Sequence, residues 1–565
     1  MDTTAHFTLV VSREEQAVSP RLVAAQAVEQ FERLDSPRIS RSEIARILQV
    51  PDSTLRHWIR TRRLRMRDSQ WPPQSVQFLE SSEGLALLRR LLTAAHLIFG
   101  QHNDCGIRNL CAFLELSGLD EFIACSYGAQ QAVAHQMESL LIAFGEQEDQ
   151  RLAASMAPRE ISVAVDETFH PQICLVGIEP VSDFILLETY QPRRDAETWN
   201  QCLGASLAQR PLIVCQVVSD QAKAIIRYTQ THLGAQHSPD LFHVQQDVSR
   251  AVSSSLASQT RSAQAQQTKA QEVMADLQGQ LAACREQCPE SQFGADLEQQ
   301  LHRAQTAEAA AAEHLAACQA RQQQARQARL GLSRDYHPFD LADGRPLEAE
   351  EVGRRLSAHF DTLEQIATEA NLSARSTKQL GKARRVLKLM LATISFIWRM
   401  FDVWFSCWDL PEPTRQWIRQ ELIPGLYLAR AAEKALTAAE RQRLRDLSQE
   451  ILVRARSPDG LWGTFSPETQ ADLEQKGQIC ADLFQWSSSC VEGRNGQLSL
   501  KHHALHRFTP GKLQALTVLH NYLVRRPDGT TAAERFYGTA PQDLFGCLLD
   551  RLAVPARPRC RRRAA

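Results

Sequence analysis

A change from helical to extended periodicity after residue 158 constrains the fold of this chain more than any other feature. Three short apolar runs follow one another closely, which favours an antiparallel meander, at residues 161–165, 173–178 and 184–189. We then expect a helix over 196–209, a fourth strand over 211–219 and a short strand over 240–243. This order of strands and helices predicts an α/β core built on a mixed sheet.

Three acidic residues that are far apart in the sequence lie at the ends of predicted elements. Asp166 ends the first strand, Asp220 ends the fourth, and Glu492 lies at the start of a predicted helix. Three converging carboxylates can hold two divalent cations for in-line attack on a phosphodiester. An aspartate at a strand end is often only a helix cap, so the surrounding sequence decides between the two interpretations.

The sequence around these acids is more specific than the acids alone. The segments are Val165-Asp-Glu-Thr, Val218-Ser-Asp-Gln-Ala-Lys-Ala-Ile, Pro239-Asp-Leu-Phe-His-Val-Gln-Gln-Asp and Cys490-Val-Glu-Gly-Arg-Asn-Gly-Gln-Leu. Together they resemble the DDE transposases with a ribonuclease-H-like core, in particular the Mutator-like and hAT-like groups and related bacterial insertion-sequence transposases. In those families a Phe-His or Cys-His pair follows the second acid, and a long helical insertion precedes a Glu followed by Asn. The resemblance covers residues 160–254 and 486–540.

The resemblance implies a role for each matching residue. Asp166, Asp220 and Glu492 match the acids that bind two Mg²⁺ or Mn²⁺ ions, and His243 matches a histidine near the scissile phosphate. Arg494 and Asn495 match positions that hold the DNA backbone. The implied activity is cleavage of transposon ends and their joining to target DNA without a covalent enzyme intermediate. Double-stranded DNA and other copies of the chain are the implied partners.

Two other functions are compatible with these residues. A domesticated transposase would bind DNA as a regulatory or architectural protein, although the intact acidic trio favours activity. A ribonuclease-H-like nuclease would act on a branched or hybrid substrate, and it would not need a helix-turn-helix for terminal repeats.

The region 1–155 is expected to be all-helical, with a helix-turn-helix at about 38–63. Ser40-Arg-Ser-Glu43 is a capping box, Pro51 ends the first helix, and 53–63 forms the second. The second helix would enter the major groove and would face DNA with Ser53, Thr54, Arg56, His57 and Arg60. The alternative is a basic helical hairpin packed on its own domain. A weaker helix-turn-helix pattern covers 106–128.

Charge is segregated along the chain. Lys and Arg number 64 and Asp and Glu number 65, so nucleic-acid binding would depend on local basic segments. Segment 36–67 and the end of the chain at 557–565 are arginine-rich. Residues after Glu492 are interpreted as phosphate contacts in preference to a histidine metal cluster, namely Lys501, His502 and Arg507.

The remaining sequence is mostly helical. Residues 156–254 and 486–565 are expected to form the two parts of the core, and 255–485 an all-helical insertion. Within it, 255–330 predicts an antiparallel coiled-coil hairpin that turns near Pro289 and Gly294. Its cysteines and His314 are interpreted as seam residues and not as a zinc site, because the pairs lie too far apart. The aromatic residues between 396 and 408 are expected in a core.

Localisation is expected to be cytoplasmic, and nucleoid-associated in a bacterium. The first residues lack the pattern of a secretory signal, and charges interrupt the most apolar stretch, 387–410. Fourteen cysteines without paired CxxC spacing indicate free thiols in a reducing compartment.

Overall fold

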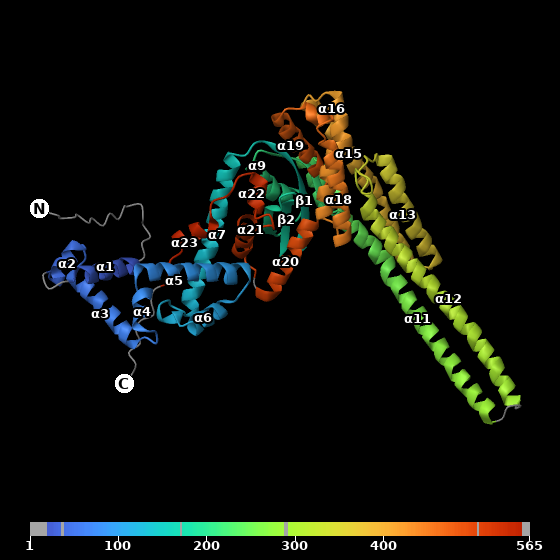
Figure 1. The fold of residues 1–565 in the computed structure, drawn as a ribbon, viewed down its shortest axis with the longest axis horizontal. Helices are drawn as coiled ribbons and strands as arrows, with labels where there is room; N and C mark the ends of the chain where they lie inside the picture. Colours follow the sequence, from blue (N-terminus) through green and yellow to red (C-terminus); the bar gives the residue numbers. More distant parts are fainter. Residues whose placement is uncertain (1–19, 36–38, 170–171, 288–291, 506–507, 556–565) are drawn as a thin grey trace.

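The computed structural model describes residues 20–35, 39–169, 172–287, 292–505 and 508–555 (Figure 1). A five-stranded sheet has the order β3-β2-β1-β4-β5. The strands are β1 (Arg159–Phe169), β2 (Ile173–Glu179), β3 (Phe184–Gln191), β4 (Leu212–Ser219) and β5 (Gln236–Pro239). Strands β1, β2 and β3 form an antiparallel meander, whereas β4 is parallel to β1 and to β5. The prediction of an α/β core with a mixed sheet is therefore confirmed.

The register between β1 and β4 places the ends of these strands side by side. Ala164 pairs with Val218, so two residues further along Asp166 comes level with Asp220. Strand β1 is central in the sheet, and Val163, Ala164 and Val165 are fully buried. Asp166 does not end its strand as predicted, because β1 continues to Phe169 in its pairing with β2.

The expected strand at 240–243 is wrong. Strand β5 ends at Pro239, and the long helix α11 (Leu241–Gln287) begins two residues later. Asp240 explains the change, since its side chain accepts a hydrogen bond from the Phe242 backbone N–H at 2.8 Å and so turns the chain into a helix. His243 therefore lies in the first turn of α11.

Helices from both ends of the chain cover the sheet and share its hydrophobic core (Figure 1). Between the strands lie α8 (Ala196–Trp199), the π-helical turn η3 (Asn200–Gly204), α9 (Ala205–Ala208), α10 (Lys223–Tyr228) and η4 (Thr229–Leu233). The C-terminal helices are α20 (Ser489–Leu505), α21 (Pro510–Tyr522), α22 (Ala532–Tyr537) and α23 (Leu544–Arg551). Helix α21 packs against β3 and against α7 (Tyr127–Ala154).

The N-terminal region does not form one separate helical domain. The first three helices have a small core of their own around Phe31, Ile44 and Leu55, and they are α1 (Pro20–Leu34), α2 (Arg41–Ile47) and α3 (Asp52–Asp68). The next helices contribute to the core that includes the sheet, and they are α4 (Pro73–Leu79), α5 (Ser82–Ala95), η1 (His96–His102), α6 (Ile107–Leu116), η2 (Leu119–Glu121) and α7.

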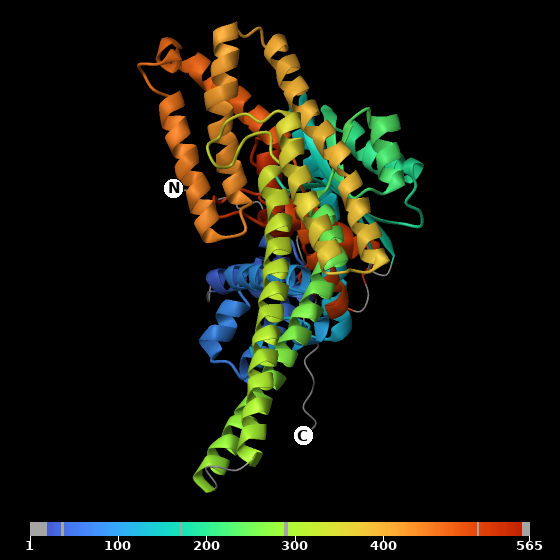
Figure 2. The same cartoon turned by 90° about the vertical axis from the view of Figure 1, so that its right-hand side faces the viewer.

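Along the chain, a helical body with its own core lies between the two parts of the sheet domain, and its long helices are visible in Figure 2. Its core begins at Leu241, at the start of α11, and ends at Trp486. After α11 and α12 (Gln292–Asp335) come α13 (Ala349–Glu369), α14 (Ala374–Arg385), α15 (Leu387–Cys407), α16 (Glu412–Trp417), η5 (Ile418–Leu422), α17 (Ile423–Glu433), α18 (Ala438–Ala455), η6 (Leu461–Thr464) and α19 (Pro467–Leu483). The predicted aromatic core is confirmed, since Phe401 and Phe405 of α15 are buried in it.

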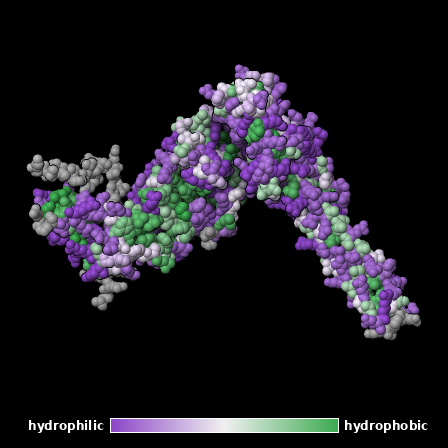
Figure 3. All heavy atoms as spheres, in the orientation of Figure 1, coloured by the Kyte–Doolittle hydropathy of each residue, from purple (hydrophilic) through white to green (hydrophobic). Residues whose placement is uncertain are grey.

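Helices α11 and α12 form the predicted hairpin, which projects from the helical body (Figure 1). Its surface is mostly hydrophilic (Figure 3). Cys318 packs in the seam against Ala263 and Leu315. Gly294 lies inside α12 and does not form the turn, whereas Pro289 and Cys288 lie outside the described residues. Among the helices that the structure describes, none combines the length and apolar character needed to cross a bilayer.

Candidate functional site

Three residues from separate parts of the chain converge where the sheet meets the helical body. Asp166 comes from β1, His243 from the first turn of α11, and Glu492 from the first turn of α20. One potential ligand atom of each lies within 4.8 Å of those of the others. The His243 Nε2 lies 3.3 Å from Glu492 Oε1. Two carboxylates and an imidazole are a donor set that suits a divalent cation.

Asp220 lies beside this cluster and is not part of its tightest group. It follows β4 directly, at the level of Asp166 on the neighbouring strand. Its Oδ1 accepts a hydrogen bond from the Ala222 backbone N–H at 2.9 Å, and its side chain is half-buried. Its negative charge acts on Asp166 and raises the pKa of that carboxyl. Asp220 therefore belongs to the same electrostatic environment.

Helix α20 supplies Glu492 and also orients Asp166. Asn495, three residues after Glu492, lies on the same side of the helix and donates from Nδ2 to Asp166 Oδ2 at 3.0 Å. The Oδ1 atom of Asn495 is buried without a hydrogen-bond partner. This unsatisfied oxygen supports the fit of the site to a cation or a water ligand.

An ion pair in the interior fixes α20 against the sheet. Arg494 donates to both carboxylate oxygens of Glu188 on β3, at 2.7 and 2.6 Å. The exposed fractions of the two side chains are 5% and 0%, so the pair is almost fully buried. The resemblance assigns Arg494 to the DNA backbone, but in this structure it is an internal anchor for the helix that carries Glu492.

A second buried contact joins the beginnings of α11 and α20. Asp240 Oδ2 accepts a hydrogen bond from Ser488 Oγ at 2.5 Å, and the Asp240 backbone N–H donates to Ser219 at the end of β4. The Leu241 backbone N–H donates to the Trp486 carbonyl. These contacts place His243 and Glu492 beside the two strand ends. Sequence reasoning missed the role of Asp240 and placed it in a strand at 240–243, although an aspartate directly before a helix is a recognised capping residue.

The electrostatics of the cluster indicate an excess of negative charge. Burial raises the pKa of Asp166 to about 7, and the charges of Glu492 and Asp220 add to this effect. The contact with Glu492 raises the pKa of His243 to about 9 against the opposing effect of burial, so the imidazole is cationic at neutral pH. His243 thus supplies the positive charge that the carboxylates require. A bound cation would compete with the proton on Asp166 and with the imidazolium.

The predicted phosphate contacts after Glu492 have different environments. Lys501 Nζ donates to Asp104 Oδ2 and to the His102 carbonyl, both at 2.6 Å, so its charge is already paired with the N-terminal helices. His502 is half-buried in α20. Arg507 lies outside the described residues. Of these three residues, Lys501 could reach phosphate only by leaving its ion pair.

The predicted recognition helix of the helix-turn-helix is α3, which extends to Asp68 and not only to residue 63. Ser40 caps α2 by accepting from the Glu43 N–H at 3.2 Å, as the capping box predicts. The residues expected to face DNA are largely exposed: Ser53, Arg56, His57 and Arg60 are exposed and Thr54 is half-buried. Arg56 is held by Asp52 at 2.9 Å. The exposed basic face of α3 suits a nucleic-acid contact.

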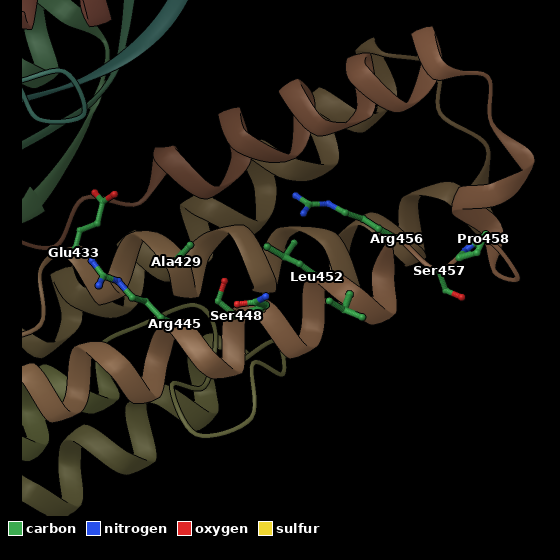
Figure 4. Close-up of a pocket in the computed structure, with 10 residues that line it drawn as sticks. Ala429, Glu433, Arg445, Ser448, Leu452, Arg456, Ser457 and Pro458 are labelled. Carbon is green, nitrogen blue, oxygen red and sulfur yellow. The ribbon is translucent and has the colours of Figure 1, made fainter. Parts of the chain in front are cut away.

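A separate pocket of about 860 Å³ lies in the helical body, between α17, α18 and the loop after α18 (Figure 4). Glu433, Arg445 and Arg456 contribute the charges on its wall. It shares no residue with the carboxylate cluster, and none of its lining residues belongs to the predicted site.

We expect the Arg494–Glu188 pair to show strong coupling in a double-mutant cycle. Arg494→Leu or Glu188→Leu alone leaves one buried charge unpaired and should lower the free energy of unfolding by about 3–5 kcal/mol. The double substitution removes both charges and should restore most of that loss. Urea denaturation measures all four proteins, and additive losses in the double variant would contradict the anchoring role.

Without divalent cations, Asp166→Asn should gain stability relative to the parent as the pH rises. The folded-state pKa of Asp166 is about 7, above its ordinary value of 3.8, so folding favours the neutral carboxyl. The parent therefore loses stability between about pH 4 and pH 7, whereas the asparagine, which cannot ionise, does not.

Thermal denaturation of both proteins across this range tests the prediction. Mg²⁺ at about pH 8 should raise the Tm of the parent by about 2 °C or more and leave Asp166→Asn unchanged. A Tm difference between the proteins that does not vary with pH would contradict the burial of this carboxyl.

Comparison with known proteins gives one partial match. A model described as a family of unknown function (DUF6399) matches residues 418–564, from η5 to beyond α23. This span contains Glu492, Arg494 and Asn495, but not Asp166, Asp220 or His243. No curated protein matches the chain, and no solved structure matches it. The matched family is thus similar to the C-terminal quarter of the chain.

Proposed function

We propose that this protein is a DDE-type transposase with a ribonuclease-H-like core, which cleaves transposon ends and joins them to target DNA. The observation that carries the proposal is the convergence of Asp166, His243 and Glu492, with Asp220 directly after the adjoining strand. The sheet has three antiparallel strands followed by two parallel ones, with Asp166 on the first strand and Asp220 after the fourth. The resemblance implies this arrangement.

Each residue of the site has a chemical task in this proposal. Asp166, Asp220 and Glu492 would hold two Mg²⁺ or Mn²⁺ ions, which stabilise charge on the attacking and leaving oxygens of an in-line displacement. Asn495 fixes the Asp166 carboxylate through its Nδ2 hydrogen bond. His243 carries a proton at neutral pH and can donate from Nε2 to a non-bridging phosphate oxygen.

The DNA-binding surfaces in this proposal lie outside the sheet. Helix α3 would contact the ends of the element through its exposed arginines, with double-stranded DNA as the partner. The hairpin of α11 and α12 would serve assembly of a homo-oligomer. A nuclease of the same core would share the carboxylate cluster, and strand transfer distinguishes the two activities.

Asp166→Asn, Asp220→Asn and Glu492→Gln should each reduce Mg²⁺-dependent cleavage and strand transfer by at least about a thousandfold, because each removes a charge needed to hold the ions. DNA affinity should change only a few fold. The assay follows labelled DNA that carries the ends of the element.

Glu167→Gln is the matched control for these variants. Glu167 is adjacent to Asp166, but its carboxylate contacts Arg194 Nη1 at 2.7 Å and Trp199 Nε1 at 3.4 Å. Its substitution should leave cleavage nearly unchanged. Full strand transfer by any of the three site variants would remove that residue from the active site, and cleavage without transfer by the parent would favour the nuclease.

Substitution of Arg60 by alanine should weaken binding to the cognate end by about 1–3 kcal/mol if the guanidinium reads a base, with little effect on a random duplex. Arg60 is exposed on α3, so its loss should not unfold the three-helix unit. Fluorescence anisotropy with both duplexes measures the difference. Equal losses on both would restrict α3 to phosphate contacts.

A further inference from the structure

Within the helical body, the longest segment without acidic residues is rich in basic ones. Residues 370–401 contain seven Lys and Arg and no Asp or Glu. They are Arg375, Lys378, Lys382, Arg384, Arg385, Lys388 and Arg399. The segment covers α14 and α15 as far as Phe401.

Four of these cations form one stripe on α14. The helix buries Ser376, Leu380 and Ala383 against the helical body. At about 100° per residue, the opposite side brings four positions into an arc of roughly 80°. These positions are Arg375, Lys378, Lys382 and Arg385, and all four side chains are exposed.

Most of the charge on this stripe is not neutralised within the protein. Arg384, which lies off the stripe, pairs with Asp361 at 2.7 Å and Glu364 at 2.6 Å. Lys382 lies 3.4 Å from Asp247 and keeps 61% of its side chain exposed. Among the described residues, Arg375, Lys378 and Arg385 form no ion pair. A protein surface with three unpaired cations in one row attracts polyanions.

The part of the stripe at Lys382 lies near the candidate active site. Asp247, the partner of Lys382, also accepts from Gln379 Nε2 at 3.5 Å, so α14 packs on the first turns of α11. His243 lies four residues before Asp247, one turn or about 6 Å along the same side of that helix. From Arg375 to Arg385 the stripe extends about 15 Å, the axial length of about four nucleotides of one DNA strand.

We propose that the α14 stripe binds the phosphate backbone of the DNA strand that leaves the active site. The inference rests on the proposed function, because a phosphodiester held at His243 and Glu492 places its flanking phosphates near this helix. The projecting hairpin is a poorer track for DNA, since residues 264–316 contain three Lys and Arg against eight Asp and Glu. That acidic segment of a second copy is the competing occupant of the stripe.

The test compares two triple variants of the full-length protein. The stripe variant is Arg375→Gln/Lys378→Gln/Arg385→Gln. The control is Arg303→Gln/Arg445→Gln/Arg454→Gln, which removes the same charge from exposed positions on α12 and α18. Thermal denaturation should give equal Tm values for both variants, because all six side chains are exposed.

Fluorescence anisotropy with a labelled duplex of about 30 base pairs in EDTA measures binding without catalysis. The stripe variant should bind about tenfold or more weakly than the parent in about 0.1 M salt, and the slope of log affinity against log salt should fall by about 3. The control should bind within about twofold of the parent. Equal affinities for the two variants, or no binding by the parent, would overturn the inference.

Two further measurements separate this inference from the proposed function and from the competing occupant. If the stripe variant loses DNA affinity and the parent shows no Mg²⁺-dependent cleavage, the surface stands and the proposed enzyme fails. If the parent cleaves DNA and the stripe variant binds and cleaves equally well, the inference alone fails. Light scattering that shows loss of self-association, with unchanged DNA affinity, would assign the stripe to the acidic hairpin of a second copy.

Discussion

The chain leaves the sheet after β5 and returns to it almost 250 residues later. One buried hydrogen bond joins the point where it leaves to the point where it returns. Ser488 Oγ donates to Asp240 Oδ2, across a separation of 248 residues, where α11 begins and shortly before α20. The Asp240 backbone is bonded in turn to the end of β4. Because His243 and Glu492 both lie within one turn of this junction, the candidate site depends on it.

The interior near the site contains one paired set of charges and one carboxyl, that of Asp166, which burial keeps from ionising readily. Arg494 and Glu188 neutralise each other without solvent, which makes them an effective anchor but not a free ligand. Within the part of the chain that the structure describes, His243 is the cation that acts on Asp166, and burial raises the pKa of this carboxyl. A carboxylate cluster that is short of positive charge is a typical environment for a functional cation. An unpaired charge is more costly to bury than a paired one. The site residues are accordingly only half-buried, whereas Arg494 and Glu188, which hold α20 in place, are almost fully buried.

Charge is also divided among the projecting parts of the molecule. The exposed faces of α3 and α14 are basic, and the distal part of the hairpin is acidic. The small overall charge of −1 therefore hides surfaces of opposite sign. In the proposed function, the basic faces contact nucleic acid and the acidic arm avoids it, since like charges repel over about a Debye length.

Local sequence patterns determined the strands of the meander, the cap at Ser40, the hairpin and the helical start at Glu492, because each depends on neighbours a few residues away. The three acids and His243 were identified from their local sequence and from a family resemblance. Tertiary structure alone decided which of them meet: Asp166, His243 and Glu492 converge, whereas Asp220 lies beside them at the end of the adjoining strand β4. It also paired Arg494 with Glu188 and Lys501 with Asp104, so that neither cation is free to contact DNA without leaving its ion pair. Such pairs join residues more than 300 positions apart, and local periodicity carries no information about partners at that separation.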